Sequence, residues 1–203
     1  MSDSPHDALR TDPDIGPLVE GHGELTLDPA DDMFRRLVVS LCRQQVSMPS
    51  AAATRDRLFD AIEVTPEGVL AADDQLLRDA GLSRQKTRYV NEVAGAFSEH
   101  GYSIGYFDGM GDDAVRATLT DITGIGQWTA NMQLLFSLGR ADVFPVGDLG
   151  VRKGFASVVG GGYERPEMVE YAERWAPHRS YATLYLWRAQ EDIEESVAEV
   201  VSE

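Results

Sequence analysis

The sequence predicts an all-α protein. Apolar residues recur three or four positions apart in several segments, which is the spacing of one face of a helix. Cap residues followed by proline mark a helix start, as at Thr65 and Pro66. No segment alternates apolar and polar residues over the length of a strand.

The expected helices begin after residue 29, because prolines and glycines interrupt any periodicity before that point. The following ranges carry an apolar face or a cap: 31–45, 50–62, 73–79, 83–100, 112–121, 129–138, 166–175 and 179–190. Further helical turns are expected after Pro66 and from Leu149, and a last candidate helix at 193–201. Three successive glycines at 160–162 separate the expected helix at 149 from the one at 166.

Length and composition exclude several classes of protein. The chain has 203 residues, enough for one domain or two small lobes with a core. It has no apolar run of about 18 residues, so we expect no membrane span. Its first residues are polar and acidic, unlike a signal peptide, and we expect a cytoplasmic protein. Cys42 is the only cysteine, which excludes an internal disulfide and a four-cysteine iron–sulfur cluster.

The net charge of −16 argues at first against a nucleic-acid partner. The acids, however, concentrate in residues 1–32 and after Arg188, whereas 33–58 and 83–90 carry more arginine and lysine than acid. Lysine is scarce, with only Lys86 and Lys153 among the 18 basic residues. This composition resembles that of proteins from salt-loving organisms; an ordinary acidic protein is the alternative.

The stretch from residue 119 to 155 is the strongest candidate for function. Gly124 and Gly126 bracket Ile125 between two expected helices, and glycines allow a sharp turn and a close approach to another molecule. The free N–H groups that open the second helix would form a phosphate site. Asp148 follows a short loop. The alternatives are a close-packed turn and a carboxylate that only caps a helix.

These residues resemble a known family. Residues 122–131 (ITGIGQWTAN) resemble the helix-hairpin-helix of the base-excision DNA glycosylase superfamily, and residues 144–148 (FPVGD) its loop ending in the catalytic aspartate. Trp128, the run at 175–181 and the pair at 187–188 are similar to the 3-methyladenine DNA glycosylase II branch. The resemblance covers about residues 34–188.

The resemblance implies two helical lobes with a cleft between them, and the hairpin and the aspartate at its mouth. Residues 1–30 would be an acidic entry segment and 31–203 a single glycosylase domain. One lobe would hold about residues 48–145, and the other would combine 31–47 with 146–203.

The resemblance further implies a monofunctional glycosylase for alkylated bases such as 3-methyladenine and 7-methylguanine. Asp148 would be the catalytic residue. The base pocket would be formed by Trp128, Met132, Trp187, Tyr181 and Tyr185. DNA would be bound by Gln44, Gln45, Gly124, Ile125, Gly126, Thr129 and Arg152. Gln45 would fill the gap left by the flipped base. We expect damaged double-stranded DNA as the partner, a monomer, and no cofactor apart from a monovalent cation that the family often holds on hairpin carbonyls.

Two other functions are weighed against this one. A bifunctional glycosylase/lyase of the endonuclease III type needs a lysine nucleophile where this chain has Trp128. A hairpin module that only binds DNA would use Asp148 as a bare cap, but it would need no aromatic pocket. Core packing is an equal alternative for Trp187, and a helix C-terminal turn is a strong alternative for residues 44–47. The four histidines are scattered without metal-ligand spacing.

Overall fold

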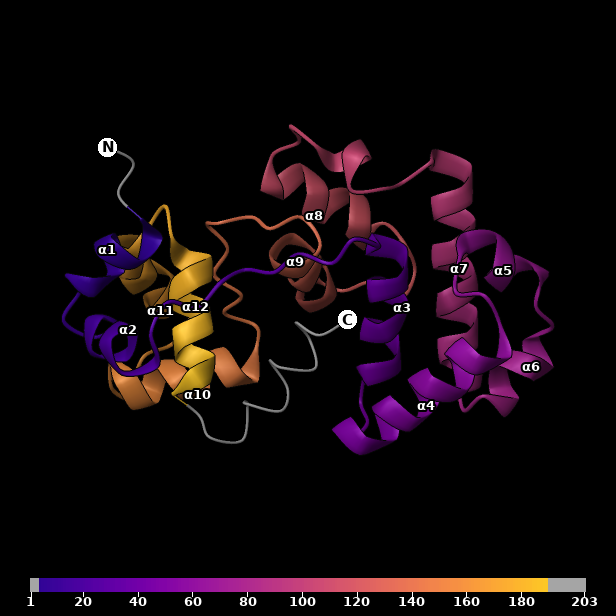
Figure 1. Ribbon diagram of the computed structural model, residues 1–203, viewed down its shortest axis with the longest axis horizontal. Helices are drawn as coiled ribbons and strands as arrows, with labels where there is room; N and C mark the ends of the chain where they lie inside the picture. The colour runs from indigo at the N-terminus through magenta and orange to yellow at the C-terminus, as the bar shows by residue number, and fades with distance from the viewer. Residues whose placement is uncertain (1–3, 190–203) are drawn as a thin grey trace. The chain divides into compact units, whose positions relative to one another are not determined.

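The computed structural model describes residues 4–189 and is helical throughout this range, without a strand (Figure 1). The α-helices are α1 (Pro5–Arg10), α2 (Gly16–His22), α3 (Met33–Arg43), α4 (Met48–Ala61), α5 (Pro66–Ala71), α6 (Asp74–Asp79), α7 (Arg84–His100), α8 (Asp112–Thr120), α9 (Gln127–Phe136), α10 (Leu149–Val158), α11 (Arg165–Ala172) and α12 (Arg179–Arg188). Two short 3₁₀-helices are η1 (Gly105–Phe107) and η2 (Glu173–Trp175). The all-α prediction is confirmed. The helix expected at 193–201 lies outside the described residues.

The segment before residue 30 is not the irregular entry that the sequence predicts. It forms α1 and α2, and the Ser4 hydroxyl accepts a hydrogen bond from the backbone N–H of His6 at the start of α1. Leu9, Ile15 and Val19 are buried. These helices have six and seven residues, fewer than two turns each, which is too short for a spacing of apolar residues to repeat. Both helices pack on α12.

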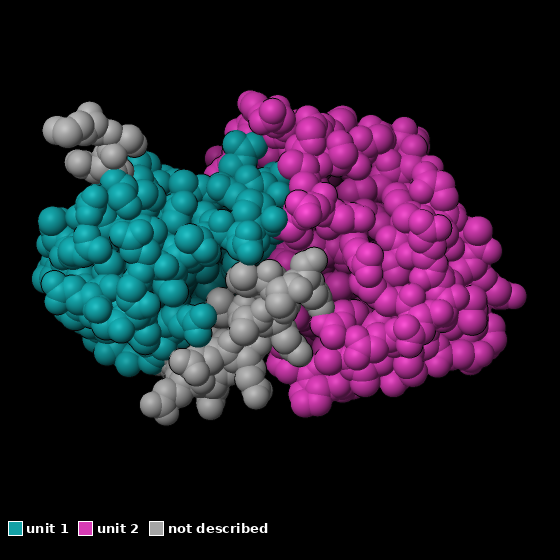
Figure 2. Space-filling view, viewed as in Figure 1, with its two compact units in different colours: residues 1–29, 134–203 teal, residues 30–133 magenta. Residues whose placement is uncertain are grey.

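The chain forms two compact units, coloured separately in Figure 2. Unit 1 comprises residues 1–29 and 134–203, and unit 2 comprises residues 30–133. The expected lobes are divided differently. The boundary expected near 145 lies at 133, within α9, and the helix at 31–47, expected to join the C-terminal helices, belongs to unit 2.

The position of α3 follows from its apolar face. Phe34, Leu37 and Leu41 are buried, and α3 packs on α4 and α7. The rings of Phe34 and Phe97 lie edge to face with centroids 5.3 Å apart. Sequence spacing shows that such a face is covered, but only packing decides which helices cover it.

The long helix of unit 2 is α7, and it packs against α3, α5 and α6. The Ser83 hydroxyl accepts from the backbone N–H of Lys86 at its start, and Gly101 ends it in the left-handed conformation with φ +67°. Val93 and Ala94 are fully buried. The predicted range of 83–100, with Ser83 as its cap, is confirmed.

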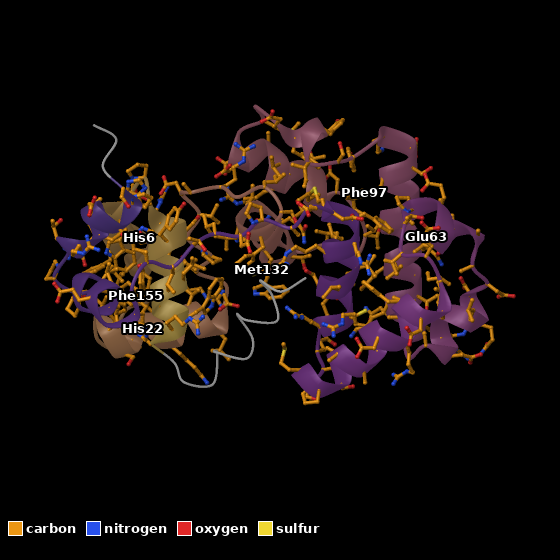
Figure 3. All side chains as sticks on the ribbon, in the orientation of Figure 1. His6, His22, Glu63, Phe97, Met132 and Phe155 are labelled. Atoms are coloured by element: carbon orange, nitrogen blue, oxygen red, sulfur yellow. The ribbon has the colours of Figure 1, made fainter. Side chains whose placement is uncertain are left out.

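In unit 1 the closest helix pair is α10 and α12. A Cβ atom added to Gly154 of α10 would lie 2.0 Å from the carbonyl oxygen of Leu186 in α12, so only glycine permits this approach. Phe155, labelled in Figure 3, contacts the rings of Tyr171 and Trp175 at 5.3 and 6.1 Å. This packing holds α10 against the end of α12 and against α11 and η2.

Among residues 4–189, no helix combines the length and the apolar character that crossing a membrane requires.

Candidate functional site

Asp148 lies at the end of the loop between α9 and α10. Its backbone N–H donates to the carbonyl of Pro145 at 2.8 Å, and its Oδ1 accepts from the N–H of Val151 at 2.9 Å. Asp148 is therefore the N-cap of α10, as the cap interpretation requires. A side chain at this position lies at the positive end of the helix dipole.

The same oxygen of Asp148 accepts a second hydrogen bond. The indole Nε1 of Trp187 on α12 donates to Oδ1 at 3.0 Å. The Trp187 ring is stacked on Phe136, with centroids 5.7 Å apart and planes 22° apart. Its side chain is therefore placed by an aromatic neighbour on one face and by the carboxylate at its edge.

Hydrogen bonds join the loop before Asp148 to the start of α12. Asp142 accepts from Arg179 Nε at 2.7 Å and from Nη2 at 2.9 Å, and the N–H of Val143 donates to the Ser180 hydroxyl at 2.8 Å. Burial alone would raise the pKa of Asp142, but the hydrogen bonds and charge of Arg179 outweigh it and lower that pKa. Sequence reasoning missed this pair, because 37 residues separate its members.

The two hairpin glycines differ in their surroundings. Gly124 has φ +101°, and a Cβ atom there would lie 2.3 Å from the ring of Tyr89 on α7. Nothing lies within 4 Å of the corresponding position at Gly126. Ile125 between them is buried and donates its N–H to the carbonyl of Ile122. Gly124 therefore closes the turn against α7, whereas Gly126 leaves the start of α9 open to a close approach.

The first turn of α9 carries the other predicted residues of this motif. Trp128 is half-buried, Thr129 has a side chain that is buried, and Met132 is 7% exposed. The backbone N–H of Ala130 donates to the carbonyl of Gly126, the first bond of the helix. The first backbone N–H groups of an α-helix have no acceptor within the helix, so a ligand can accept hydrogen bonds from them.

The predicted wedge loop at 44–47 is joined to the hairpin. Gln44 ends α3, and its side-chain Nε2 donates to the carbonyl of Gly124 at 3.2 Å. Lys86 Nζ donates to the carbonyl of Cys42 at 2.6 Å, at the end of the same helix, and burial lowers the pKa of Lys86. Gln45 is exposed and has φ +59°, a conformation that is uncommon for residues other than glycine. Gln44 is thus an anchor, and Gln45 is the side chain presented by the loop.

The two tyrosines predicted for the base pocket contact the N-terminal segment of unit 1. Tyr185 is fully buried; its hydroxyl donates to the carbonyl of Gly23 at 2.8 Å and accepts from the N–H of Leu25 at 3.3 Å. Residues two apart on a helix are turned about 200° from each other, so Tyr185 faces away from Trp187. Tyr181, one turn earlier on that same face, packs against the ring of His6. Tyr185 is therefore a core residue of unit 1, and the pocket expectation is corrected for it, whereas Tyr181 is half-buried and its place in the pocket stays a prediction.

The predicted residues therefore divide between the two units. Unit 1 contains Asp148, Trp187 and Arg152, whose Nε donates to the backbone carbonyl of Asp148 at 3.4 Å. Unit 2 contains the hairpin, the loop at 44–47, Trp128 and Met132.

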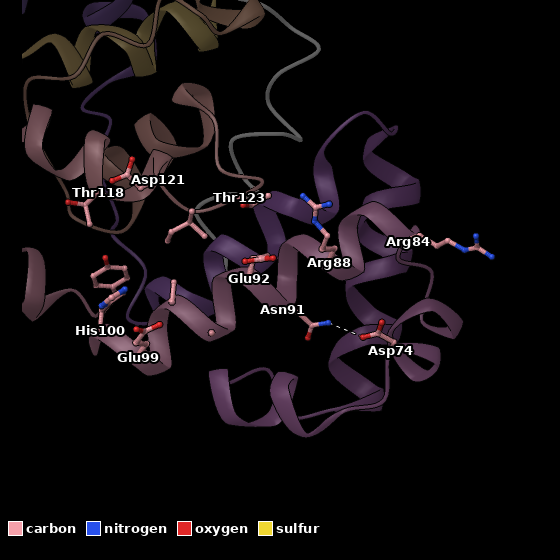
Figure 4. A pocket seen from close by; sticks show the side chains of 14 residues that line it. Asp74, Arg84, Arg88, Asn91, Glu92, Glu99, His100, Thr118, Asp121 and Thr123 are labelled. Carbon is pink, nitrogen blue, oxygen red and sulfur yellow. Dashed lines mark hydrogen bonds between the residues drawn. The ribbon is translucent and has the colours of Figure 1, made fainter.

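A groove of about 730 Å³ lies in unit 2 beside the hairpin, along α7 (Figure 4). Arg84, Arg88 and Asn91 line it together with Thr123, and Asn91 donates to Asp74 at 2.9 Å. It also contains four carboxylates, from Asp74, Glu92, Glu99 and Asp121. This mixture of charges does not favour phosphate along its whole length, and sequence reasoning did not point to it. No group of three or more potential metal-ligating side chains occurs in the described part of the chain.

Comparison with known proteins identifies the family to which the chain belongs. The chain is similar to DNA-3-methyladenine glycosylase 2 of Escherichia coli, with 31% identity over 185 residues that cover 85% of this chain and 63% of the relative. It also spans 66% of the length of a Bacillus subtilis relative that is 33% identical.

Two solved structures are similar as well. A DNA-3-methyladenine glycosidase from Bacillus halodurans has a TM-score of 0.83 at 33% identity, covering 96% of this chain and 93% of that one. A Schizosaccharomyces pombe 3-methyladenine DNA glycosylase in complex with abasic DNA has a TM-score of 0.79 at 26% identity, covering 91% and 95%. Residues 38–177 match the family described as HhH-GPD superfamily base excision DNA repair protein. The chain belongs to the HhH-GPD superfamily of base excision DNA repair proteins.

Proposed function

We propose that this chain is a monofunctional DNA glycosylase that hydrolyses the N-glycosidic bond of alkylated bases in duplex DNA. The observation that carries the proposal is the Asp148 carboxylate, held at the start of α10 by two N–H donors. The match of residues 38–177 to a base excision repair family supports it. The relatives named as 3-methyladenine glycosylases support an alkylated base as the substrate.

Asp148 is the proposed catalytic residue. As the bond from C1′ to the base nitrogen stretches, positive charge develops on the sugar, and a fixed carboxylate stabilises that charge. Water adds to C1′, the base leaves with the bonding electron pair, and Asp148 accepts the proton of the water. An alkylated purine carries a positive charge beforehand and leaves as a neutral molecule, so no second carboxylate is needed to protonate it.

The proposed base pocket uses the first turns of α9. The bond to be broken is unreachable within a stacked duplex, so the nucleotide must leave the stack. Trp128 offers a partly exposed indole, and Met132 follows one turn later on the same helix. An indole attracts a cationic base more strongly than a neutral one, by about 0.5–2 kcal/mol. This preference would select alkylated purines over ordinary ones.

The proposed contacts with the DNA backbone come from the hairpin and the loop of unit 2. Gly126 provides the open approach to the N–H groups of α9, which suit a phosphate. Gln45 projects from the loop anchored by Gln44, and it would enter the gap left by the flipped base. A monovalent cation on the hairpin carbonyls is compatible with these residues. The carbonyls of Ile122 and Gly124 each accept one hydrogen bond, and each has a second lone pair.

The test is release of bases from methylated duplex DNA, identified by chromatography, under single-turnover conditions. We expect 3-methyladenine and 7-methylguanine to be released by the wild-type protein. Asp148→Asn keeps an oxygen that can cap α10 but removes the charge, so excision should fall by at least ~100-fold. Asp60→Asn, an exposed carboxylate on α4, is the matched control and should behave as wild type.

Binding to a duplex with an abasic-site analogue should survive Asp148→Asn, because the proposed phosphate contacts do not involve the carboxylate. No release of any methylated base by the wild-type protein contradicts the proposed function. Release at the wild-type rate by Asp148→Asn contradicts only the role of the carboxylate.

A further inference from the structure

Trp187 was expected from the sequence to form a wall of the base pocket, and its surroundings suit a different role. Its side chain is 6% exposed, and Phe136 covers one face of the indole. Little ring surface is therefore presented for a base to stack upon. The polar edge of the ring, in contrast, is directed at Asp148, 3.0 Å from Nε1 to Oδ1.

From this geometry we infer that Trp187 is a positioning residue, which fixes the plane of the Asp148 carboxylate for attack at the sugar. The inference rests on the proposed function, since it assigns a role within the same site. An N-cap bond alone leaves a carboxylate able to rotate about the bond to its Cβ. Two donors from different helices, the N–H of Val151 in α10 and Nε1 of Trp187 in α12, restrain that rotation. They thereby set the direction in which Oδ2 points.

The kind of donor matters for the chemistry. An indole N–H can donate a hydrogen bond but cannot accept one, so it favours a carboxylate oxygen that acts as an acceptor. It is also neutral. An arginine or lysine in its place would form an ion pair with Asp148 and neutralise the negative charge that stabilises the positive sugar. Trp187 orients the anion and leaves its charge intact.

The helix packing of unit 1 makes this contact possible. The close approach of α10 and α12 at Gly154 and Leu186 brings the last turn of α12 beside the start of α10. Stacking on Phe136 then sets the direction of the indole, with planes 22° apart. The contact of Gly154 with α12 and the stacking of Trp187 on Phe136 thus determine the orientation of the Asp148 carboxylate.

The first test is Trp187→Phe, which keeps an aromatic ring for Phe136 and removes only the N–H. We expect the single-turnover rate of base release to fall ~10–100-fold, while affinity for an abasic-analogue duplex stays within about twofold. The loss should be the same factor for a cationic base such as 7-methylguanine and for a neutral one such as hypoxanthine, because the carboxylate acts on the sugar. A pocket wall behaves otherwise: phenylalanine would largely replace it, and any loss would depend on the charge of the base.

A double mutant separates positioning from general packing. In an Asp148→Asn background, Trp187→Phe should cost little further activity, because residues that act as a unit are not additive. Trp175→Phe also removes an indole N–H from unit 1, but one without an acceptor among the described residues; it is the matched control and should leave the rate of base release unchanged.

A measurement that does not depend on the folding of Trp187→Phe uses the indole N–H itself. In ¹⁵N-labelled wild-type protein, the Trp187 indole resonance should shift on Asp148→Asn more than those of Trp128 and Trp175. An unmoved resonance, or a Trp187→Phe protein with the wild-type rate, overturns the inference even when the wild type excises methylated bases. Absence of excision by the wild type would instead reject the proposed function.

Discussion

Replacing Gly124 by alanine is expected to destabilise the protein, whereas replacing Gly126 by alanine is expected to weaken DNA binding. At Gly124 an L-residue would have to adopt φ +101°, which costs about 1–3 kcal/mol. Its Cβ would also overlap the Tyr89 ring, with the nearest ring carbon 2.3 Å away, and such overpacking costs about 1–3 kcal/mol. Gly124→Ala should therefore destabilise the protein by about 2–6 kcal/mol, or roughly 4–24 °C in Tm for a chain of this length.

At Gly126 an added methyl group meets no atom within 4 Å. Gly126→Ala should leave Tm unchanged or raise it slightly, because alanine reduces the freedom of the unfolded chain by about 0.4–1 kcal/mol. The methyl group would nevertheless occupy the space that a DNA phosphate needs. Affinity for an abasic-analogue duplex should fall in Gly126→Ala while stability does not.

The assay is thermal unfolding followed by duplex binding at a fixed salt concentration. Tyr89→Ala combined with Gly124→Ala provides the control, because it removes the overlap and leaves only the backbone strain. The double mutant should be more stable than the sum of the two single changes predicts. Equal Tm values for Gly124→Ala and Gly126→Ala, or a stable Gly124→Ala protein, would refute this account of the hairpin.

Three further predictions concern lyase chemistry, acid stability and salt. Because Trp128 stands where a lyase needs its amine, borohydride with abasic-site DNA should trap no covalent complex; a strong cross-link at Lys86 or Lys153 would contradict the monofunctional assignment. Asp142→Asn should lower the free energy of unfolding by about 1–3 kcal/mol at neutral pH. Since Arg179 lowers the pKa of Asp142, that contribution is present above the ordinary aspartate pKa of about 3.9 and is lost as the pH falls through the lower folded value. In urea unfolding, the difference in free energy of unfolding between wild type and Asp142→Asn should therefore be larger at pH 7 than at pH 3. Finally, the net charge of −16 should make Tm and excision rate higher in strong KCl, where the screening length is roughly 3 Å at 1 M; a maximum of both near 0.1 M would refute the halophilic interpretation.

The long helix α7 could be predicted from the sequence with both of its ends. The range from Ser83 to His100 has a serine cap, a repeating apolar face and a final glycine, and all three are local features. Asp148 could be recognised as a helix cap on the same grounds, because a cap bond joins residues three apart. The short helices before residue 30 could not be, since their burial against α12 rather than their own periodicity holds them in place.

The candidate site divides in the same way. Residue type and local spacing were enough to single out the hairpin and the loop ending at Asp148, and the resemblance to a family supplied the residues that could serve as pocket or wedge. The sequence could not separate the roles of Gly124 and Gly126, which lie in one turn, or of Trp187 and Tyr185, which lie on one expected helix, because the neighbours of each residue are distant in the chain.

Tertiary structure decided those differences. Tyr89 lies 35 positions before Gly124 and fills the space beside it, while Gly23 and Asp148 engage Tyr185 and Trp187 on opposite faces of one helix. Such contacts join residues 35 to 162 positions apart, and they exist only after the helices have packed. Local sequence thus determined where the longer helices form and which side chains could act, and long-range packing decided the short helices and the role of each side chain.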